Sequence, residues 1–340
     1  MKPIFPLVAV ATALMGGARD AHAWDETFGR MSLRVTGYGT AGIFEPDFQD
    51  PDFLVVWRAR AQATWAAGDR HNVGVAYAID AIAVDDGRPM REVFGFYDYA
   101  PWGRLEFGVT DSIARKLGVG LPDVGGLRVN DQPLFYDFVH PHGPVIGDSV
   151  LTTGRRALRL NAVTTPRAGT QYGLSVAGGT DDYNVALDGA IKIRRPAGKL
   201  KTAWTAAASL MDGPDGYRAD AYGPRITADW RAQAALGMNL QYNSWMLGLT
   251  ARAIYDRNPV GAIGDGLAMG AGVSYDFLKY SLSATYILSD VGLWHDGETY
   301  VDHTGLVSFR YKYSPNVDGW LSVGVTTSDA FLSAGMRLTF

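Results

Sequence analysis

Arginines recur at alternate positions in two segments of the chain, and this spacing determines where their charges can act. Arg58 and Arg60 lie two residues apart in "VVWRARAQATW", and Arg155 and Arg159 lie four apart in "TGRRALRLNAV". Residues two or four apart in a β-strand point to the same face. Each segment would therefore present a pair of guanidinium groups on one side of a strand, where they can attract anions and repel cations.

Aspartates gather in the long connection between these two segments. The connection runs over about 111–150 and holds Asp111, Asp123, Asp131 and Asp137 around a Gly-rich centre. Loops longer than about 12–15 residues are uncommon and are usually functional. If this loop folds toward the arginines, the opposed charges create a transverse field that orients dipolar solutes and selects small ions.

The elements that position these groups are predicted to be strands, because apolar and polar residues alternate through almost all of the chain after residue 30. The C-terminal stretch "LSAGMRLTF" is typical, with Leu332, Ala334 and Met336 separated by small or polar residues. The pattern predicts sixteen strands, and fourteen to eighteen are compatible with it. They lie near 31–44, 53–66, 71–82, 90–100, 102–110, 151–163, 170–179, 184–194, 199–211, 226–241, 245–256, 266–277, 280–290, 300–313, 319–327 and 331–340.

The connections and the aromatic residues indicate whether the apolar face of each strand points outward or inward. Short turns such as "AGDR" and "RPAG" alternate with longer loops such as "DGPDGYRADAYGP". Several apolar faces end in aromatic residues, as with Trp57 and Trp65 or Trp245 and Tyr255. These features predict an all-β fold, a transmembrane antiparallel β-barrel with aromatic girdles and a polar lumen. An exported soluble β-sandwich, with its apolar faces inward, is the alternative.

A barrel in a membrane must close, because each unpaired backbone group in hydrocarbon costs several kcal/mol. The last strand, which ends at Phe340, is therefore predicted to pair with the first strand near 31–44. The chain would end where the barrel closes.

The N-terminus is typical of an export signal, with Lys2 before the apolar core "IFPLVAVATALMGG" and with "AHA" at 21–23. Cleavage after Ala23 would leave 24–340 as a single barrel domain. It would remove Lys2, Arg19 and Asp20, so that 31 basic and 35 acidic residues become 29 and 34. This acidic balance excludes a generally basic nucleic-acid-binding protein.

Composition narrows the remaining classes. Apolar residues make up 47% of the chain, which is too many for a disordered protein. After the signal, no segment approaches the roughly 18 uninterrupted apolar residues of a membrane-spanning helix. The chain has no cysteine, which excludes thiol catalysis and thiolate metal sites.

The order of several motifs resembles that of the general porins of Gram-negative bacteria. "TGYGTAGIF" resembles the family's first strand, although Thr40 stands where some members have a lysine. The segment around Arg58 resembles the second strand, "REVFGFYDYAPWGRLEFG" with Arg91 resembles the fourth and fifth, and the segment around Arg155 resembles the sixth. "LPDVGG" at 121–126 resembles a turn of the family's third outer loop, with Val124 in place of an aromatic residue.

This resemblance implies a sixteen-stranded homotrimeric barrel in the bacterial outer membrane, whose third outer loop, here about 111–150, folds into the lumen. It implies passive diffusion of small hydrophilic solutes and ions, contact with outer-membrane lipids and lipopolysaccharide, and no cofactor or metal. Phe340 resembles the family's C-terminal insertion signal. The implied constriction has a basic wall and an acidic loop, formed by Arg58, Arg60, Arg91, Arg155 and Arg159 and by Asp111, Asp123 and Asp131.

Other functions stay open from the residues alone. Arg60 and Arg159 are equally compatible with wall positions away from the narrow point. A lipid-hydrolysing barrel enzyme needs a serine and a histidine in reach of each other, and His140 and His142 lie near Ser149, but no Gly-x-Ser-x-Gly motif occurs. A substrate-specific channel and a structural adhesion barrel are further alternatives, although we expect a channel that is not an enzyme.

Overall fold

The computed structural model of the chain describes most of the residues after the expected signal. The described residues are 24–46, 52–83, 90–125, 128–129, 132–133, 157–180, 183–212, 217–218, 225–226, 229–257, 266–292, 299–327 and 330–340. The predicted signal segment 1–23 lies outside them, so its cleavage remains a prediction. In the described ranges, no helix is long and apolar enough to cross a membrane.

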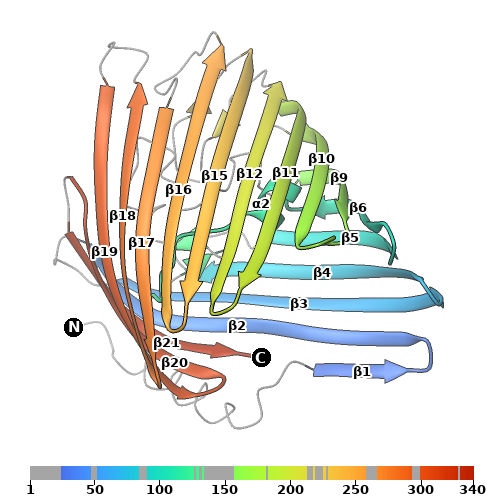
Figure 1. Ribbon diagram of the computed structural model, residues 1–340, viewed down its shortest axis with the longest axis horizontal. Helices are drawn as coiled ribbons and strands as arrows, with labels where there is room; N and C mark the ends of the chain where they lie inside the picture. Colours follow the sequence, from blue (N-terminus) through green and yellow to red (C-terminus); the bar gives the residue numbers. More distant parts are fainter. Residues whose placement is uncertain are drawn as a thin grey trace.

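Long antiparallel strands make up nearly all of the structure (Figure 1). The main sheet contains β1 (Trp24–Phe28), β2 (Met31–Pro46), β3 (Asp52–Gly68), β4 (His71–Ala83), β5 (Met90–Tyr99), β6 (Gly103–Thr110), β9 (Ala157–Thr164), β10 (Thr170–Thr180), β11 (Tyr183–Ala197), β12 (Leu200–Asp212), β15 (Trp230–Tyr242), β16 (Trp245–Arg257), β17 (Gly266–Phe277), β18 (Tyr280–Gly292), β19 (Thr299–Ser314), β20 (Val317–Val325) and β21 (Ala330–Thr339). Between these strands lie α2 (Ile113–Leu117) and two short hairpins, β7 (Arg128–Val129) with β8 (Gln132–Pro133) and β13 (Tyr217–Arg218) with β14 (Arg225–Ile226).

The main sheet closes on itself. β2 pairs with β3 along one edge and with β21 along the other, and the strands between them pair in chain order. The described sheet has seventeen strands, and without the short β1 sixteen strands form the closed ring. The predicted all-β barrel of sixteen strands is therefore confirmed, whereas β1, whose sequence WDETF does not alternate, was not predicted.

The end of the chain lies where the prediction placed it, against the first strand of the ring. The backbone N–H of Phe340 donates to the carbonyl of Gly37 at 2.8 Å, and the N–H of Gly37 donates back at 2.6 Å. The ring of Phe340 covers Gly37 so closely that a Cβ there would lie 2.6 Å from it. β1 continues the same edge of β2, with Trp24 opposite Val35. Closure by the last strand is confirmed.

The two faces of the strands also follow the predicted pattern. On β18, Leu282 and Tyr286 point outward and about half of their surface is exposed, whereas Ser283 and Thr285 point inward and are buried. The outer surface is apolar along most strands, and the inner surface is polar, as in a membrane barrel.

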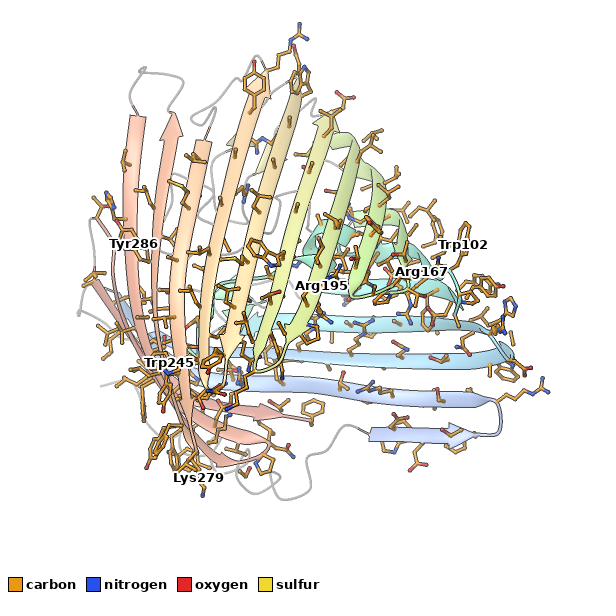
Figure 2. The ribbon with its side chains drawn as sticks, viewed as in Figure 1. Trp102, Arg167, Arg195, Trp245, Lys279 and Tyr286 are labelled. Carbon is orange, nitrogen blue, oxygen red and sulfur yellow. The ribbon has the colours of Figure 1, made fainter. Side chains whose placement is uncertain are left out.

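Short turns join the strands at one end of the barrel, which we call the turn end, and longer connections join them at the other, the loop end. Figure 2 shows Trp102, Arg167, Arg195, Trp245 and Lys279 along the turn end. Aromatic rings cluster there, which fits the interfacial girdle of a membrane barrel.

Candidate functional site

The connection after β6 turns into the barrel and begins with the helix α2. Ser112 caps this helix by accepting a hydrogen bond from the N–H of Arg115 at 3.2 Å. Ile113 and Ala114 are fully buried against Ala190 of the inner wall and its small neighbours on the adjoining strands. Gly173 of β10 is needed here, because a Cβ at this position would overlap the side chain of Ile113.

Polar side chains of the wall hold the end of α2. The hydroxyl of Thr205 on β12 donates to the carbonyl of Leu117 at 3.0 Å, and Lys192 on β11 donates to the carbonyl of Gly118 at 3.3 Å. These groups satisfy carbonyls that the helix end leaves without intrahelical partners.

Beyond α2 the loop continues along the inner wall toward β20. Pro122 lies against Gly248 of β16, where a Cβ would clash with the proline ring. The N–H of Val124 donates to the hydroxyl of Ser283 on β18 at 3.0 Å. The predicted inward folding of the third outer loop is therefore confirmed for 111–125.

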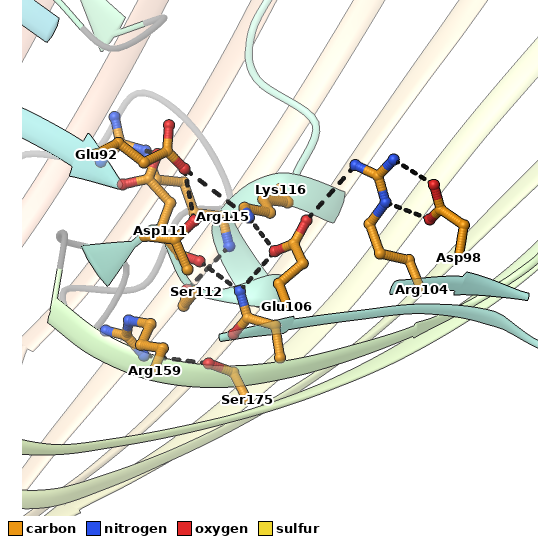
Figure 3. A network of polar contacts seen from close by, with 12 residues as sticks. Glu92, Asp98, Arg104, Glu106, Asp111, Ser112, Arg115, Lys116, Arg159 and Ser175 are labelled. Carbon is orange, nitrogen blue, oxygen red and sulfur yellow. Dashed lines mark hydrogen bonds and ion pairs between the residues drawn. The ribbon is translucent and has the colours of Figure 1, made fainter. Parts of the chain in front are cut away.

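Lys116 is the centre of a charged network at the point where the loop leaves the wall, which we call the loop root (Figure 3). Its ammonium group donates to Glu106 on β6 and to the hydroxyl of Thr110 at 2.8 Å, and it lies 4.0 Å from Glu92 on β5. Thr110 in turn donates to Glu92 at 2.5 Å. The cation of the loop thus bridges two buried carboxylates of the wall.

Neighbouring groups extend the loop root toward β9. The amide of Asn161 donates to Glu106 at 3.0 Å and to the carbonyl of Asp111 at 2.9 Å. Arg115 lies 3.6 Å from the carboxylate of Asp111, one helical turn away. The start of the loop is therefore fixed through both its backbone and its side chains.

A fully buried ion pair lies beside the loop root. Arg159 of β9 donates to Asp188 of β11 at 2.8 Å and to Ser175 of β10 at 3.2 Å, and neither charged side chain is exposed. A buried pair of this kind is strongly destabilising when one partner alone is removed.

Charged side chains on this part of the inner wall form ion pairs with one another. Five carboxylates and five cations take part in pairs within 4.0 Å, and these pairs form separate groups. The paired residues are Glu92, Asp98, Glu106, Asp111 and Asp188, and Arg58, Arg104, Arg115, Lys116 and Arg159.

Solved structures share this architecture, although no model of a protein family and no curated protein matches the sequence. The chain superposes on the trimer form of OmpT, an outer membrane protein of Vibrio cholerae, with a TM-score of 0.67 and 12% identity, covering 91% of this chain and 99% of that one. For OmpF of Salmonella typhi in complex with daunomycin the TM-score is 0.66 at 12% identity, covering 93% and 100%. For the outer membrane channel DcaP of Acinetobacter baumannii the TM-score is 0.60 at 13% identity, covering 94% and 100%.

The chain has the fold of the sixteen-stranded outer-membrane porins. At 12–13% identity the likeness concerns the fold, so the roles of individual residues in this porin fold are judged from their own geometry.

Two of the predicted basic residues face the interior from β3. The guanidinium group of Arg58 lies 3.8 Å from Glu92, and that of Arg60 lies 5.6 Å from the centre of the Phe94 ring. Both side chains are partly exposed. Arg155 lies outside the described residues.

The prediction that Arg91 faces the lumen is wrong. Arg91 is exposed on the outer face of β5, while Glu92, Phe94 and Phe96 point inward and are buried. Inside the barrel, Glu92 accepts a hydrogen bond from Thr110 and lies near Lys116. Because neighbouring residues of a strand point to opposite faces, Arg91 then points outward.

Two further predicted positions point inward but do not line an open path. Arg159 is 1% exposed and Asp111 is 7% exposed, and each is enclosed by the contacts described above. Both are held in ion pairs, Asp111 with Arg115 and Arg159 with Asp188, and their place in a constriction stays a prediction.

Asp123 of the loop lies on the opposite part of the inner wall. Its carboxylate accepts hydrogen bonds from the N–H of Gly125 at 2.9 Å and from Ser283 at 3.3 Å. Asp131, His140, His142 and Ser149 lie outside the described residues.

Several charged residues of the interior were not predicted. Lys116 and Glu106 hold the loop root, and Arg231 and Arg252 are buried on the inner faces of β15 and β16. The alternation of these residues with outward apolar ones was a usable signal for the wall positions. The described residues contain no group of three or more histidine or acidic side chains that could hold a metal.

Proposed function

We propose that the protein is an outer-membrane channel for passive diffusion of small hydrophilic solutes and ions. The observation that supports this most directly is the segment 111–125, which runs inside a closed barrel and is fastened to its inner wall by buried polar contacts. Such a loop narrows a lumen whose walls are polar, while the apolar outer face suits hydrocarbon.

The proposed site is the part of the interior between this loop and β3. Arg58 and Arg60 supply its basic wall, with Arg155 as a further candidate. Asp123 and Asp131 are the proposed acidic groups of the loop. The turn end is proposed to face the periplasm, because short turns lie on that side in outer-membrane barrels.

We further propose a homotrimer of the mature chain 24–340 in contact with outer-membrane lipids and lipopolysaccharide. The related fold of OmpT is described in a trimer form. Outward positions of β3 are small, at Ala59, Ala61 and Ala63, which fits close contact between subunits. A trimer predicts migration as an SDS-resistant oligomer until the sample is heated.

The channel is tested by reconstituting the purified protein in planar lipid bilayers and measuring conductance and the reversal potential in a KCl gradient. Arg58→Ala/Arg60→Ala removes two inward cations and should move the reversal potential toward cation selectivity. Arg91→Ala is the matched control, because it removes an arginine from the outer face of the adjoining part of the wall. A protein that inserts but never conducts would refute the proposed channel.

A further inference from the structure

We propose that the inner wall at the turn end of β11, β12 and β15 is a binding site for small solutes that carry phosphate groups. The proposal rests on the proposed channel, because solutes reach this wall through the lumen. It concerns a region away from the loop root and from β3.

The strand register places three cations on one patch of the inner face. Lys192 and Arg194 are two residues apart on β11, so both point inward. Lys201 on β12 also points inward. It lies opposite Pro196, which is two residues nearer to the turn than Arg194. Three positively charged residues from two adjacent strands thus lie in three successive inward rows of the sheet, with Lys192 furthest from the turn.

Amide side chains border the same patch on β15. Gln241 lies opposite Lys201, and Asn239 lies opposite Ala203, which is itself opposite Arg194. The small Ala203 leaves space at the centre of this arrangement. Cations together with amide N–H donors are the groups that bind phosphate oxygens.

The surface is hollowed at this place. A concavity of about 290 Å³ is bordered by Arg194, Lys201, Asn239 and Gln241, and also by Arg195 and Met246. This volume is just below the ~300–1,000 Å³ typical of small-molecule sites, so it suits a phosphate or a small phosphorylated solute.

The cations of the patch are not neutralised by carboxylates in the described structure. Neither Arg194 nor Lys201 forms an ion pair among the described residues, and Lys192 donates to the carbonyl of Gly118. Two described acidic residues on nearby strands are engaged elsewhere. Asp188 is paired with Arg159, and Asp276 contacts Arg310 at 3.6 Å and accepts a hydrogen bond from Ser281. The patch therefore keeps an excess of positive charge.

Outward arginines of the same turns have a different role. Arg195 donates to the carbonyl of Ala168, and Arg167 donates to the carbonyl of Pro101 at 2.8 Å, so both fasten neighbouring turns to each other (Figure 2). Their guanidinium groups are therefore hydrogen-bonded to backbone carbonyls. Arg194 and Lys201 lie on the inner face and form no ion pair among the described residues, which supports a role toward solutes.

The patch lies on the same strand, β11, that packs under α2, between the loop and the turn end. Ala190, which packs under α2, and Arg194 are four residues apart on β11, or about 13 Å along the strand. Lys192 lies between them and holds the end of α2. A solute that passes the loop on this side meets Lys192, Arg194 and Lys201 in turn.

Isothermal titration calorimetry of the detergent-solubilised full-length protein with inorganic pyrophosphate tests the site directly, at low ionic strength because exposed charges are screened by salt. Saturable binding is expected for the wild type, and at least tenfold weaker binding for Arg194→Gln/Lys201→Gln. The control Lys199→Gln/Lys279→Gln removes two lysines from turns of the same end and should bind like the wild type. Absence of binding to the wild type, or equal binding by the first variant, would overturn the proposal.

A bilayer measurement separates this proposal from the proposed channel. Pyrophosphate should reduce the chloride current of the wild type and of the control in a saturable manner, and should have little effect on Arg194→Gln/Lys201→Gln. A protein that binds pyrophosphate in the calorimeter but never conducts would refute the channel and retain the site. A protein that conducts but does not bind would refute the site and retain the channel. Heat-modifiable migration on gels, unchanged from the wild type, verifies that each variant is folded.

Discussion

One strand, β11, contributes charged residues to two regions of the interior that use charge in opposite ways. Beside the loop root, Asp188 is fully buried and paired with Arg159 at 2.8 Å. At the turn end, Lys192 and Arg194 point to the same face of the same strand, where no carboxylate pairs with them among the described residues. From this contrast we infer that a charge of the inner wall acts most strongly on solutes where it is exposed and has no close carboxylate.

The energetic consequences of the two arrangements differ as well. Removing one member of a sealed pair leaves a charge that has neither partner nor water. Removing a cation that faces water changes the local field and little else. Mutations at the loop root should therefore change stability first, and mutations at the turn end should change ion selectivity first.

The largest effect is expected for Arg159→Ala. Asp188 would remain buried without its 2.8 Å ion pair to Arg159, and breaking a buried pair from one side costs about 3–5 kcal/mol. Unfolding by urea in lipid vesicles, followed by tryptophan fluorescence, should shift to markedly lower denaturant concentration.

The double variant Arg159→Met/Asp188→Leu is the control for this prediction. It replaces both charges by apolar groups of similar volume, which can be nearly neutral. Recovery of stability is expected. A single variant as stable as the wild type would show that water reaches Asp188, and the contrast between the two regions would disappear.

A smaller loss is expected for Lys116→Met. Glu106 and Thr110 lose a charged donor, which costs about 1.5–3 kcal/mol, but Asn161 still donates to Glu106. Because Lys116 attaches the loop to the wall, single-channel recordings should show additional conductance levels. Lys116→Met/Glu106→Gln should restore part of the stability, and a quiet, unchanged channel in the single variant would contradict an anchoring role.

Alternation predicted the faces of strands only where the two faces differ in polarity. On β18 the serines and threonines alternate with leucine and tyrosine, so inside and outside were clear. On β5, Val93 and Tyr97 point outward while Phe94 and Phe96 point inward. Both faces are apolar there, the pattern carries no preference, and the position assigned to Arg91 was wrong.

The sequence could not predict which charged residues pair across strands, for a different reason. Arg159 on β9 and Asp188 on β11 have β10 between them. Their contact depends on the registers of β9 with β10 and of β10 with β11, and residue types do not predict these registers. The turn-end cations were closer to prediction, because "RPAG" is a hairpin turn with Lys192 and Arg194 before it and Lys201 after it. Their common face follows from period two, but their lack of acidic partners required the neighbouring strands.

Gly173→Ala tests whether the loop depends on close packing as well as on charge. The new Cβ would overlap Ile113, and overpacking of this kind costs about 1–3 kcal/mol unless α2 moves. A displaced α2 should raise or broaden the single-channel conductance. Gly173→Ala/Ile113→Ala should return it toward the wild-type value, and equal conductance in all three proteins would show that α2 does not set the width of the path.

The smallest change in stability, and the most direct test of the contrast, is expected for Asp98→Asn. Asp98 contacts Arg104 at 2.5 and 2.8 Å near the turn end of β5 and β6, and both side chains are about a quarter exposed. Partly exposed pairs contribute about 0.2–1 kcal/mol, so the urea midpoint should hardly move. In the variant, Arg104 of the inner wall loses its close carboxylate and keeps only a more distant one, Glu106 at 3.9 Å. The reversal potential should therefore shift toward anion selectivity, opposite to the shift expected for Arg58→Ala/Arg60→Ala. A shift toward cation selectivity would mean that pairing does not decide which inner-wall charges act on ions.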